Sequence, residues 1–149
     1  MSSANFSDAV QNYLREIYKL QAEHAPVKTS TLARRMGVAP PSATAMVKKL
    51  AALGLADHQL YRGVRLTRRG ERIALEVLRH HRLVELYLAK TLELELDAVH
   101  AEADRLEHVL SETLEQRIDA ALGSPTEDPH GAPIPDAKLR IARPAAEVR

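Results

Sequence analysis

The chain has 149 residues, of which 45% are hydrophobic, so it is long enough for one average domain or two small ones with a real core. It contains no cysteine, which excludes a disulfide framework and thiolate metal sites, and no apolar run approaches the roughly 18 residues of a membrane span. The N-terminal sequence lacks the basic and apolar regions of a signal peptide. We therefore expect a cytoplasmic protein with no membrane partner.

The net charge of +1 hides an uneven distribution along the chain. Residues 1–70 hold 11 Lys and Arg against 4 Asp and Glu, a balance of +7, whereas residues 71–149 hold 10 against 16, a balance of −6. A basic half suits a polyanion, and an acidic half repels one but can hold cations. The alternative is a chance asymmetry of solvated surface charge.

Two helices are predicted at the start of the chain. Apolar residues at helical spacing predict a helix over about residues 8–23, with Ser7 as its cap. Thr29 or Ser30 can cap a short second helix, and Gly37 can end it in the left-handed conformation. A tight turn after this second helix sets the next helix at a steep angle to it.

A third helix and a hairpin follow. Pro40-Pro41 opens the helix, with Pro41 at the first helical position, and Gly54 ends it. Residues 55–60 and 64–67 can pair as a hairpin, which must lie against the helices because two short strands are not stable alone. The inner stripe expected for the third helix is Ala43, Met46, Val47, Leu50 and Leu53.

The acidic half is predicted to be helical. We expect helices over about residues 68–91, over 97–110 with Asp97 as cap, and over 112–122 with Ser111 as cap. Residues from 124 onward are rich in Pro and Gly and predict an irregular tail or linker. The predicted fold is mainly α, with a winged helix-turn-helix in residues 1–70, an all-helical dimerisation domain in 71–124, and the tail in 125–149.

The order helix, helix, turn, helix, hairpin is the plan of a winged helix-turn-helix, whose third helix enters the major groove of double-stranded DNA. Small and hydroxyl side chains at the start of this helix allow close approach to the bases, and the later lysines and the hairpin arginines suit phosphates. An ordinary small helical domain with lysines on its solvated face is the alternative. The candidate DNA contacts are Thr29, Pro41, Ser42, Thr44, Ala45, Lys48, Lys49, Arg62 and Arg65.

Metal-ligand residue types recur at helical spacing in the acidic half. His81 and Glu85 are four residues apart and can chelate one ion. In the next helix, four such residues share one face, beside an apolar stripe that is expected in the core and consists of Val99, Ala103, Leu106 and Leu110. If the two helices pack antiparallel, six candidate ligands converge: His81, Glu85, His100, Asp104, Glu107 and His108. Oxygen and imidazole donors without sulfur suit Mn²⁺ or Fe²⁺ and also accept Co²⁺, Ni²⁺, Zn²⁺ or Cd²⁺ in vitro. A solvated acidic helix face is the alternative. The remaining histidines (His24, His58, His80 and His130) lack such partners and are interpreted as surface residues.

Several stretches, in order, resemble the diphtheria-toxin-repressor and manganese-transport-regulator family of bacterial metalloregulators. They are NYLREIYKL (12–20), APPSATAMVKKL (39–50), LYRGVRLTRRG (60–70), HRLVELYL (81–88), HAEADRLEHVLSETLEQRI (100–118) and GAPIP (131–135). The resemblance implies a homodimer that binds a palindromic operator when metal is present, and that represses metal-uptake genes.

The resemblance also implies how the ligands divide. One site would use Asp104, Glu107 and His108 together with Asn12 on the first helix, and a neighbouring site His81, Glu85 and His100. A carboxylate at position 104 favours Mn²⁺. The family carries Met or Asp at position 12, and Arg15 stands at a further manganese-type ligand position, so the second site is expected to differ from the paired manganese type. Longer relatives continue into a small SH3-like barrel for which residues up to 149 leave no room, so we interpret the chain as a short member or as part of a longer one.

We therefore expect a metal-dependent transcriptional regulator, not an enzyme. Two alternatives remain: a metal-independent winged-helix dimer whose acidic helices only dimerise, and a metalloenzyme. No general base or nucleophile accompanies the cluster, and an enzyme would leave the basic half unexplained.

Overall fold

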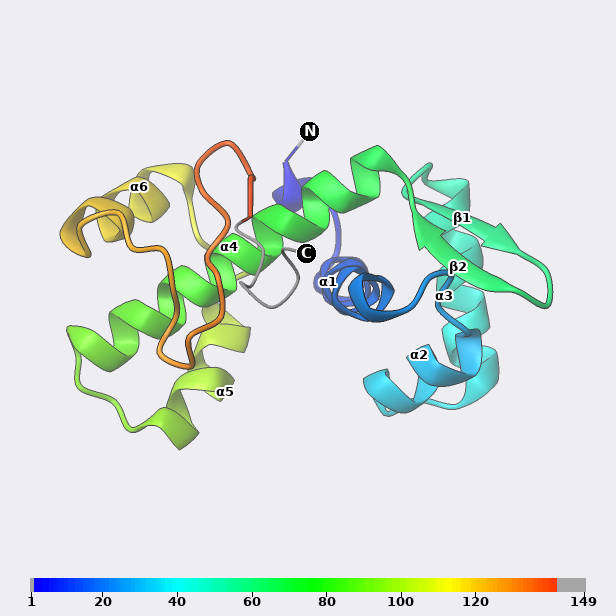
Figure 1. Cartoon of the computed structure of the whole chain (residues 1–149), viewed down its shortest axis with the longest axis horizontal. Coiled ribbons are helices and arrows are strands. Elements are labelled where there is room, and N and C mark those ends of the chain that lie inside the picture. The colour runs from blue at the N-terminus through cyan, green and yellow to red at the C-terminus, as the bar shows by residue number, and fades with distance from the viewer. Residues whose placement is uncertain (1, 142–149) are drawn as a thin grey trace, which may run out of the picture. The chain divides into compact units, whose positions relative to one another are not determined.

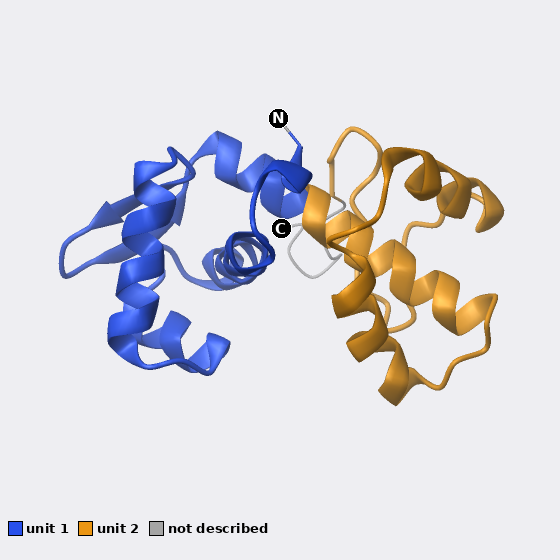
Figure 2. Ribbon diagram, turned by 180° about the vertical axis from the view of Figure 1, so that it is seen from behind, with its two compact units in different colours: residues 1–75 blue, residues 76–149 orange. Residues whose placement is uncertain are grey.

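The chain divides into two compact units, residues 1–75 and residues 76–149, and the computed structural model describes residues 2–141 (Figure 2). In chain order the elements are η1 Ser3–Asn5, α1 Asp8–Glu23, α2 Thr29–Met36, α3 Pro40–Ala52, β1 Ala56–Gln59, β2 Gly63–Leu66, α4 Arg68–Lys90, α5 Leu96–Leu106 and α6 Glu112–Ala121 (Figure 1). The mainly α fold with one small hairpin is as predicted. No helix among residues 2–141 has the length and hydropathy of a membrane span.

The N-terminal ends of α1 and α2 show one correct and one wrong cap prediction. The Ser7 hydroxyl accepts a hydrogen bond from the Val10 N–H at 3.2 Å, as expected. The cap expected from Thr29 or Ser30 is wrong, because the Lys28 carbonyl already accepts from the Leu32 N–H. Lys28 is therefore the N-cap, and its side chain makes no capping bond.

Helix α3 begins one residue earlier than expected, with Pro40 rather than Pro41 at its first position and Ala39 as its N-cap. Of the predicted inner stripe, Ala43, Val47 and Leu50 are fully buried. Leu53 is 37% exposed, because the helix ends at Ala52 and Leu53 already belongs to the turn that follows.

The hairpin of the first unit consists of two strands, and a short segment before α2 pairs with the second of them. Strands β1 and β2 pair antiparallel, with Ala56 opposite Leu66 and Gln59 opposite Gly63. Val27, between α1 and α2, exchanges two 2.8 Å backbone hydrogen bonds with Val64 of β2. The core beneath these strands comes from every helix of the unit and includes Val10, Leu14, Ile17, Leu32, Ala43, Val47, Leu50, Leu55, Val64, Leu66 and Ile73.

In the second unit, α4 packs against two groups of residues. One cluster joins Leu83 and Leu86 of α4 to Ile118 of α6 and Ile134. The other joins Val84 and Leu88 of α4 to Val99 and Ala103 of α5. These two clusters bring α5 and α6 against α4, which places the side chains of α5 beside those of the middle of α4.

Helix α5 is shorter than predicted. It spans Leu96–Leu106 with Glu95, not Asp97, as its N-cap, and the chain turns through residues 107–109 instead of continuing to 110. Leu106, expected in the core, is 40% exposed. The predicted Ser111 cap of α6 is confirmed, since its hydroxyl accepts from the Leu114 N–H at 3.1 Å.

The segment after α6 is irregular, as expected, but it is packed into the second unit. Ile134 is 6% exposed, and its N–H donates to the Thr126 carbonyl, which closes a loop. The guanidinium groups of Arg79 and Arg82 donate to the carbonyls of Pro135 and Pro133. This loop is therefore held along α4.

Candidate metal centre and nucleic-acid interface

The turn between α2 and α3 presents one face of α3 to solvent. Gly37 has a φ of 66°, the left-handed conformation that a glycine adopts at low cost, and its N–H closes the end of α2. Helix α3 begins with Pro40 and Pro41, which have no N–H, and the N–H groups of Ser42 and Ala43 donate to the Ala39 carbonyl. The start of this helix therefore offers side chains rather than free backbone N–H groups to a partner.

The DNA-contact candidates on α3 lie opposite its buried stripe. Pro41, Ser42, Ala45, Lys48 and Lys49 are exposed, and Thr44 is half-buried. Thr29, the first residue of α2, is also half-buried. Neither lysine forms an ion pair with any residue in the described part of the chain. The helix thus offers small and hydroxyl side chains near its start and two cations a turn later.

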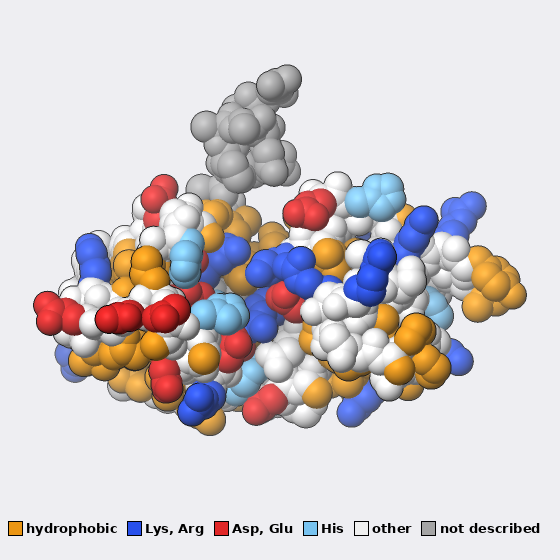
Figure 3. Space-filling view, turned by 90° about the horizontal axis from the view of Figure 1, so that it is seen from below, with side chains coloured by type: hydrophobic (Ala, Val, Ile, Leu, Met, Phe, Trp, Pro, Cys, Tyr) orange, Lys and Arg blue, Asp and Glu red, His pale blue; other side chains and the backbone are white. Residues whose placement is uncertain are grey.

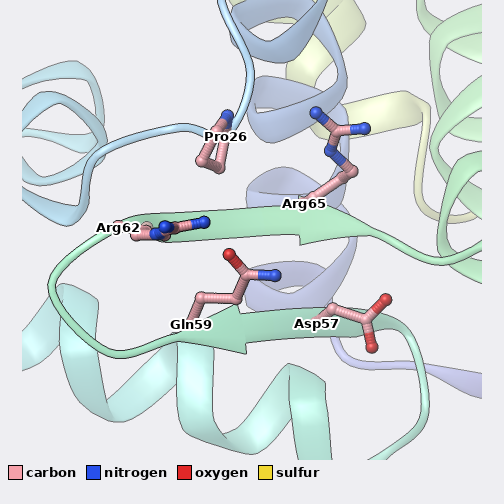
Figure 4. Close-up of a pocket in the computed structure, with 6 residues that line it drawn as sticks. Pro26, Asp57, Gln59, Arg62 and Arg65 are labelled. Atoms are coloured by element: carbon pink, nitrogen blue, oxygen red, sulfur yellow. The ribbon is translucent and has the colours of Figure 1, made fainter.

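The hairpin adds two further cations. Arg62 and Arg65 are exposed, and together with Pro26, Asp57, Gln59 and Gly63 they line a hollow of about 280 Å³ beside the hairpin (Figure 4). Within residues 2–141, no carboxylate forms an ion pair with either arginine. Their charge is therefore available to an anion.

In the second unit, the six predicted metal ligands form one connected cluster. The centre is His81 of α4, which hydrogen-bonds the Glu85 carboxylate through Nε2 and the Glu107 Oε2 through Nδ1, the latter at 2.6 Å. The His81 Nδ1 also lies 3.4 Å from the Asp104 Oδ1, and the His100 ring packs edge-on against the His81 ring with centroids 4.9 Å apart.

The outer members of the cluster complete these contacts. The two ring nitrogens of His100 lie 3.7 Å from the Glu85 Oε1 and 3.5 Å from the Asp104 Oδ2. The His108 Nε2 lies 3.3 Å from the Glu107 Oε1. Donor atoms of His81, His100 and Asp104 all lie within 4.8 Å of one another, a spacing that one ion can span. This spacing supports the antiparallel convergence of α4 and α5 expected from the sequence.

Burial makes the charges of this cluster interdependent. Glu85 is 3% exposed and Glu107 only 1%. Burial alone lowers the pKa of His81, but the hydrogen bonds and negative charges of Glu107 and Glu85 outweigh it and raise that pKa to about 9. Burial raises the pKa of Glu85, but the His81 hydrogen bond and the nearby histidine charges give a net lowering. A protonated His81 thus neutralises two buried carboxylates, a task that a divalent cation also performs.

A further group of ligand type was missed from the sequence. Donor atoms of Glu85, Asp128 and His130 lie within 4.8 Å of one another, and the His130 Nδ1 is 3.5 Å from the Glu85 Oε2. That Oε2 is buried and has no hydrogen-bond partner among the described residues. Asp128 uses its Oδ1 to accept the N–H groups of His130 and Ala132. The interpretation of His130 as a residue without partners is therefore wrong.

His80 is also not the surface residue that the sequence suggested. It is 5% exposed, and its Nε2 lies 2.8 Å from the Glu115 Oε2. Arg79 hydrogen-bonds the same carboxylate and lies 3.7 Å from the Asp119 Oδ1. These contacts tie α4 to α6, so we assign them to packing.

Asn12, the seventh predicted ligand, belongs to the first unit. It is half-buried on α1, and its Oδ1 is buried without a hydrogen-bond partner in the part of the chain that the structure describes. Arg15, one turn later, pairs with Glu16 at 3.2 Å. A buried amide oxygen without a donor is compatible with a ligand role, because desolvating such an atom is costly unless something replaces water.

Two protein-family models match the chain, one in each part of the sequence. The model of the iron dependent repressor N-terminal DNA binding domain matches residues 5–64, and that of the iron dependent repressor metal binding and dimerisation domain matches residues 67–136. The chain belongs to the iron-dependent repressor family. This confirms the resemblance drawn from the sequence motifs.

Two curated relatives resemble the chain over most of its length. The iron-dependent repressor IdeR of Mycobacterium tuberculosis (strain ATCC 25618 / H37Rv) is 38% identical over 128 residues, which cover 86% of this chain and 56% of that protein. The HTH-type transcriptional regulator MJ0568 of Methanocaldococcus jannaschii is 33% identical over 113 residues, covering 75% and 90%. The chain thus spans about half the length of IdeR and most of MJ0568.

A solved structure of a manganese-dependent transcriptional repressor in complex with manganese has the same fold. Its TM-score is 0.82 at 44% identity, covering 91% of this chain and 63% of that one. The likeness supports a fold in which a winged helix-turn-helix is followed by a helical region.

Proposed function

We propose that the chain is a metal-dependent regulator of transcription that represses metal-uptake genes when Mn²⁺ or Fe²⁺ is plentiful. The observation that carries the proposal is the convergence of six ligand-type side chains from α4, α5 and the turn after it, four of them almost fully buried, in a chain whose other unit is a basic winged helix-turn-helix. Relatives named as iron-dependent and manganese-dependent repressors support it. A metal-independent dimer has no such support.

The donor set fits a hard divalent cation. It offers carboxylate oxygens and imidazole nitrogens without sulfur, which suits Mn²⁺ or Fe²⁺. Two buried oxygens, the Glu85 Oε2 and the Asn12 Oδ1, lack hydrogen-bond partners among residues 2–141. When bound, the metal would neutralise the buried carboxylates and take over the hydrogen-bonding role of the His81 proton. The carboxylate of Asp104 favours Mn²⁺ over Fe²⁺.

We divide the proposed ligands into two sites. Asp104, Glu107 and His108 would hold one ion, with Asn12 as the ligand from the first unit. A second ion would be held by His81, Glu85 and His100. Asp128 and His130 lie beside Glu85 and would add donors to this second site. An ion bound by residues of both units has affinity only for arrangements in which those residues meet, and it shifts the population towards them by its differential binding free energy.

The proposed partners are a second copy of the chain and double-stranded DNA in the cytoplasm. Apolar side chains stand exposed in the second unit, with Leu106 at 40%, Val109 at 76% and Leu114 at 51%, and a second copy would cover them. A two-fold dimer presents two copies of α3, which suits a palindromic operator. The α3 contacts would be Pro41, Ser42, Thr44, Ala45, Lys48 and Lys49, with Thr29 on α2 and Arg62 and Arg65 on the hairpin.

The test is metal-dependent DNA binding. A binding site is first selected from a random duplex library in Mn²⁺, and fluorescence anisotropy then measures affinity with Mn²⁺ and with chelator. We expect tighter binding in Mn²⁺, by one to three kcal/mol of coupling, roughly 5- to 150-fold. Equal affinity in both conditions contradicts the proposal.

Matched variants of two glutamates sharpen this test. Glu107→Gln removes a buried charge from the cluster and should abolish the Mn²⁺ effect while keeping metal-free DNA binding. Glu102→Gln is the control, because Glu102 lies on α5, just before the turn that holds Glu107, and its carboxylate lies 3.9 Å from the exposed Arg105. A loss of metal response in the control equal to that in Glu107→Gln contradicts the ligand assignment.

A further inference from the structure

The hairpin tip, residues 60–62, exposes two apolar side chains next to a cation. Tyr61 is 98% exposed and Leu60 is 71% exposed. Arg62 follows them, is exposed, and forms no ion pair with any residue between 2 and 141. Orange and blue side chains stand beside one another at this end of the first unit (Figure 3). Single exposed apolar residues are common, but two in succession at a tight turn are unusual, because turns select Gly, Asn and Asp.

The acidic segment, residues 92–97, exposes the opposite combination. It comprises the loop after α4 and the first two residues of α5. Leu92 and Leu96 are each 53% exposed. Glu93, Glu95 and Asp97 are exposed and form no ion pair with any described residue. Glu95 is the N-cap of α5, yet its side chain makes no capping hydrogen bond, so capping does not explain its carboxylate.

Both surfaces are built on a costly backbone conformation. The φ of Tyr61 is 66° and that of Glu93 is 55°, in the left-handed region that residues with long side chains rarely adopt. Glycine or asparagine would serve either turn at lower cost. Because both side chains are exposed, packing within the chain does not offset this cost. Strain that is kept at an exposed residue points to a contact outside the chain.

Each surface stands on a firm base. The two hydrogen bonds between Val27 and Val64 attach the hairpin to a third segment. In the second unit, the Leu94 N–H donates to the Leu88 carbonyl at 3.1 Å, and the Leu94 side chain packs against the cluster that joins α4 to α5. Surfaces held in this way lose little conformational freedom when they bind.

The two surfaces are complementary in charge. Residues 58–65 hold two arginines and no acidic residue, a charge of +2. Residues 90–97 hold one lysine and three acidic residues, a charge of −2. Each surface also exposes two large apolar side chains. Since one chain carries both halves, identical copies can join head to tail through two different patches.

The acidic segment is separate from the surface proposed above for the dimer. Leu96 is the first residue of α5 and Leu106 is the last, so they lie about 15 Å apart along the helix. The other exposed apolar residues of the proposed dimer face, Val109 and Leu114, come after Leu106 in the sequence. A copy docked on the acidic segment therefore uses the other end of α5.

We propose that the hairpin tip of one copy docks on the acidic segment of another, so that copies associate head to tail in addition to forming the dimer. Tyr61 and Leu60 pack against Leu92 and Leu96, and Arg62 pairs with the carboxylates between them. The contact is small, so it is weak and reversible. Arg62 is also a proposed DNA contact, so DNA and a second copy exclude one another at the tip, and the association belongs to the DNA-free protein.

Sedimentation velocity of the full chain in EDTA, without DNA, tests this contact. Protein concentration is raised to about 0.5 mM, which detects dissociation constants of about 1 mM or tighter. The tip variant is Arg62→Glu, and the segment variant combines Glu93→Lys with Glu95→Lys. Arg72→Glu is the matched control, because it makes the same charge change at an exposed arginine of the first unit. Circular dichroism checks that every variant folds.

We expect the unmodified protein and the Arg72→Glu control to pass from dimer to larger species as concentration rises, and each charge variant to stop at the dimer. An equal mixture of the two charge variants should regain the larger species, because each supplies the surface that the other lacks. Tyr61→Ser should weaken the association by about tenfold, and salt at about 0.3 M should weaken it further.

Three results overturn the proposal. An unmodified protein that remains a dimer at every concentration has no such contact. If the segment variant loses the dimer itself while the tip variant associates normally, the acidic segment belongs to the dimer interface. If both charge variants stop at the dimer and their mixture does too, the contact does not join tip to segment.

Discussion

The proton on His81 should stabilise the metal-free protein at neutral pH and cease to do so in alkali. The pKa of His81 in the folded chain is about 9, against an ordinary value of 6.5 that the unfolded chain is expected to have. A raised pKa means that the folded state holds the proton more tightly. The stabilisation is therefore complete below pH 6.5 and is lost as the pH rises through 9.

The magnitude follows from the size of this shift. A difference of about 2.5 pKa units at about 1.4 kcal/mol each gives roughly 3 kcal/mol at pH 6, about half of that at pH 8, and almost nothing at pH 10. The side chain of His81 is 7% exposed, so solvent screening removes little of it. This is a large fraction of the stability of a small domain.

Urea unfolding in EDTA, followed by circular dichroism at several pH values, measures this contribution. Other groups titrate in the same range, so the quantity to compare is the difference in unfolding free energy between the unmodified protein and His81→Gln. We expect that difference to fall by about 3 kcal/mol between pH 6 and pH 10. A difference that stays constant across this range refutes the charge assignment of His81.

The affinity for Mn²⁺ should rise with pH, whereas the stability of the metal-free protein falls with pH. A metal that binds the His81 ring must displace its proton, so the apparent affinity should rise by about tenfold per pH unit below 9. Calorimetric titration at pH 6.5 and 7.5 in buffers of different ionisation enthalpy measures both the affinity and the proton released.

Three substitutions probe the framework around the sites, each by urea unfolding of the metal-free protein. Gly63→Ala places a Cβ against the Val27 carbonyl oxygen and should lower the free energy of unfolding by about 2 kcal/mol or more. An unchanged urea midpoint would show that the backbone at the base of the hairpin shifts to accept the Cβ, which contradicts this prediction. Ser111→Ala removes the cap of α6 and should cost about 1 kcal/mol, with the exposed Ser30→Ala as a neutral control. Arg79→Ala leaves its carboxylate partners on α6 and the Pro135 carbonyl without their donor and should cost about 3 kcal/mol, and a loss below 1 kcal/mol contradicts the packing role given to that network.

The parts of the fold that were predictable depend on neighbours in sequence. The bounds of α1 follow from apolar spacing and a cap at Ser7, both of which act within a few residues. The cluster of six ligand-type side chains was predictable for the same reason, because most of these residues recur along α4 and α5 at intervals of three or four residues. The end of α5 was not predictable, because Glu107 lies in the turn after the helix and its carboxylate hydrogen-bonds His81, which is 26 residues earlier in the sequence.

The parts that were missed depend on partners distant in sequence. His130 lies beside Glu85, 45 residues before it, and His80 beside Glu115, 35 residues after it. No residue pattern within one helical turn of either histidine predicts these contacts. The pair Asp128 and His130, two ligand types separated by one residue, was the available signal, but a Pro- and Gly-rich surrounding favoured a solvated tail.

The closed loop between Thr126 and Ile134 has an evolutionary consequence. Its attachment to α4 comes from Ile134 and from backbone carbonyls, whereas His130, half exposed, contributes no side chain to the interior. Selection can therefore exchange the residue at position 130 for another donor, or for none, at little cost in folding. Under the proposed function, this loop is a place where ion preference can change while the helices that carry the other proposed donors stay as they are.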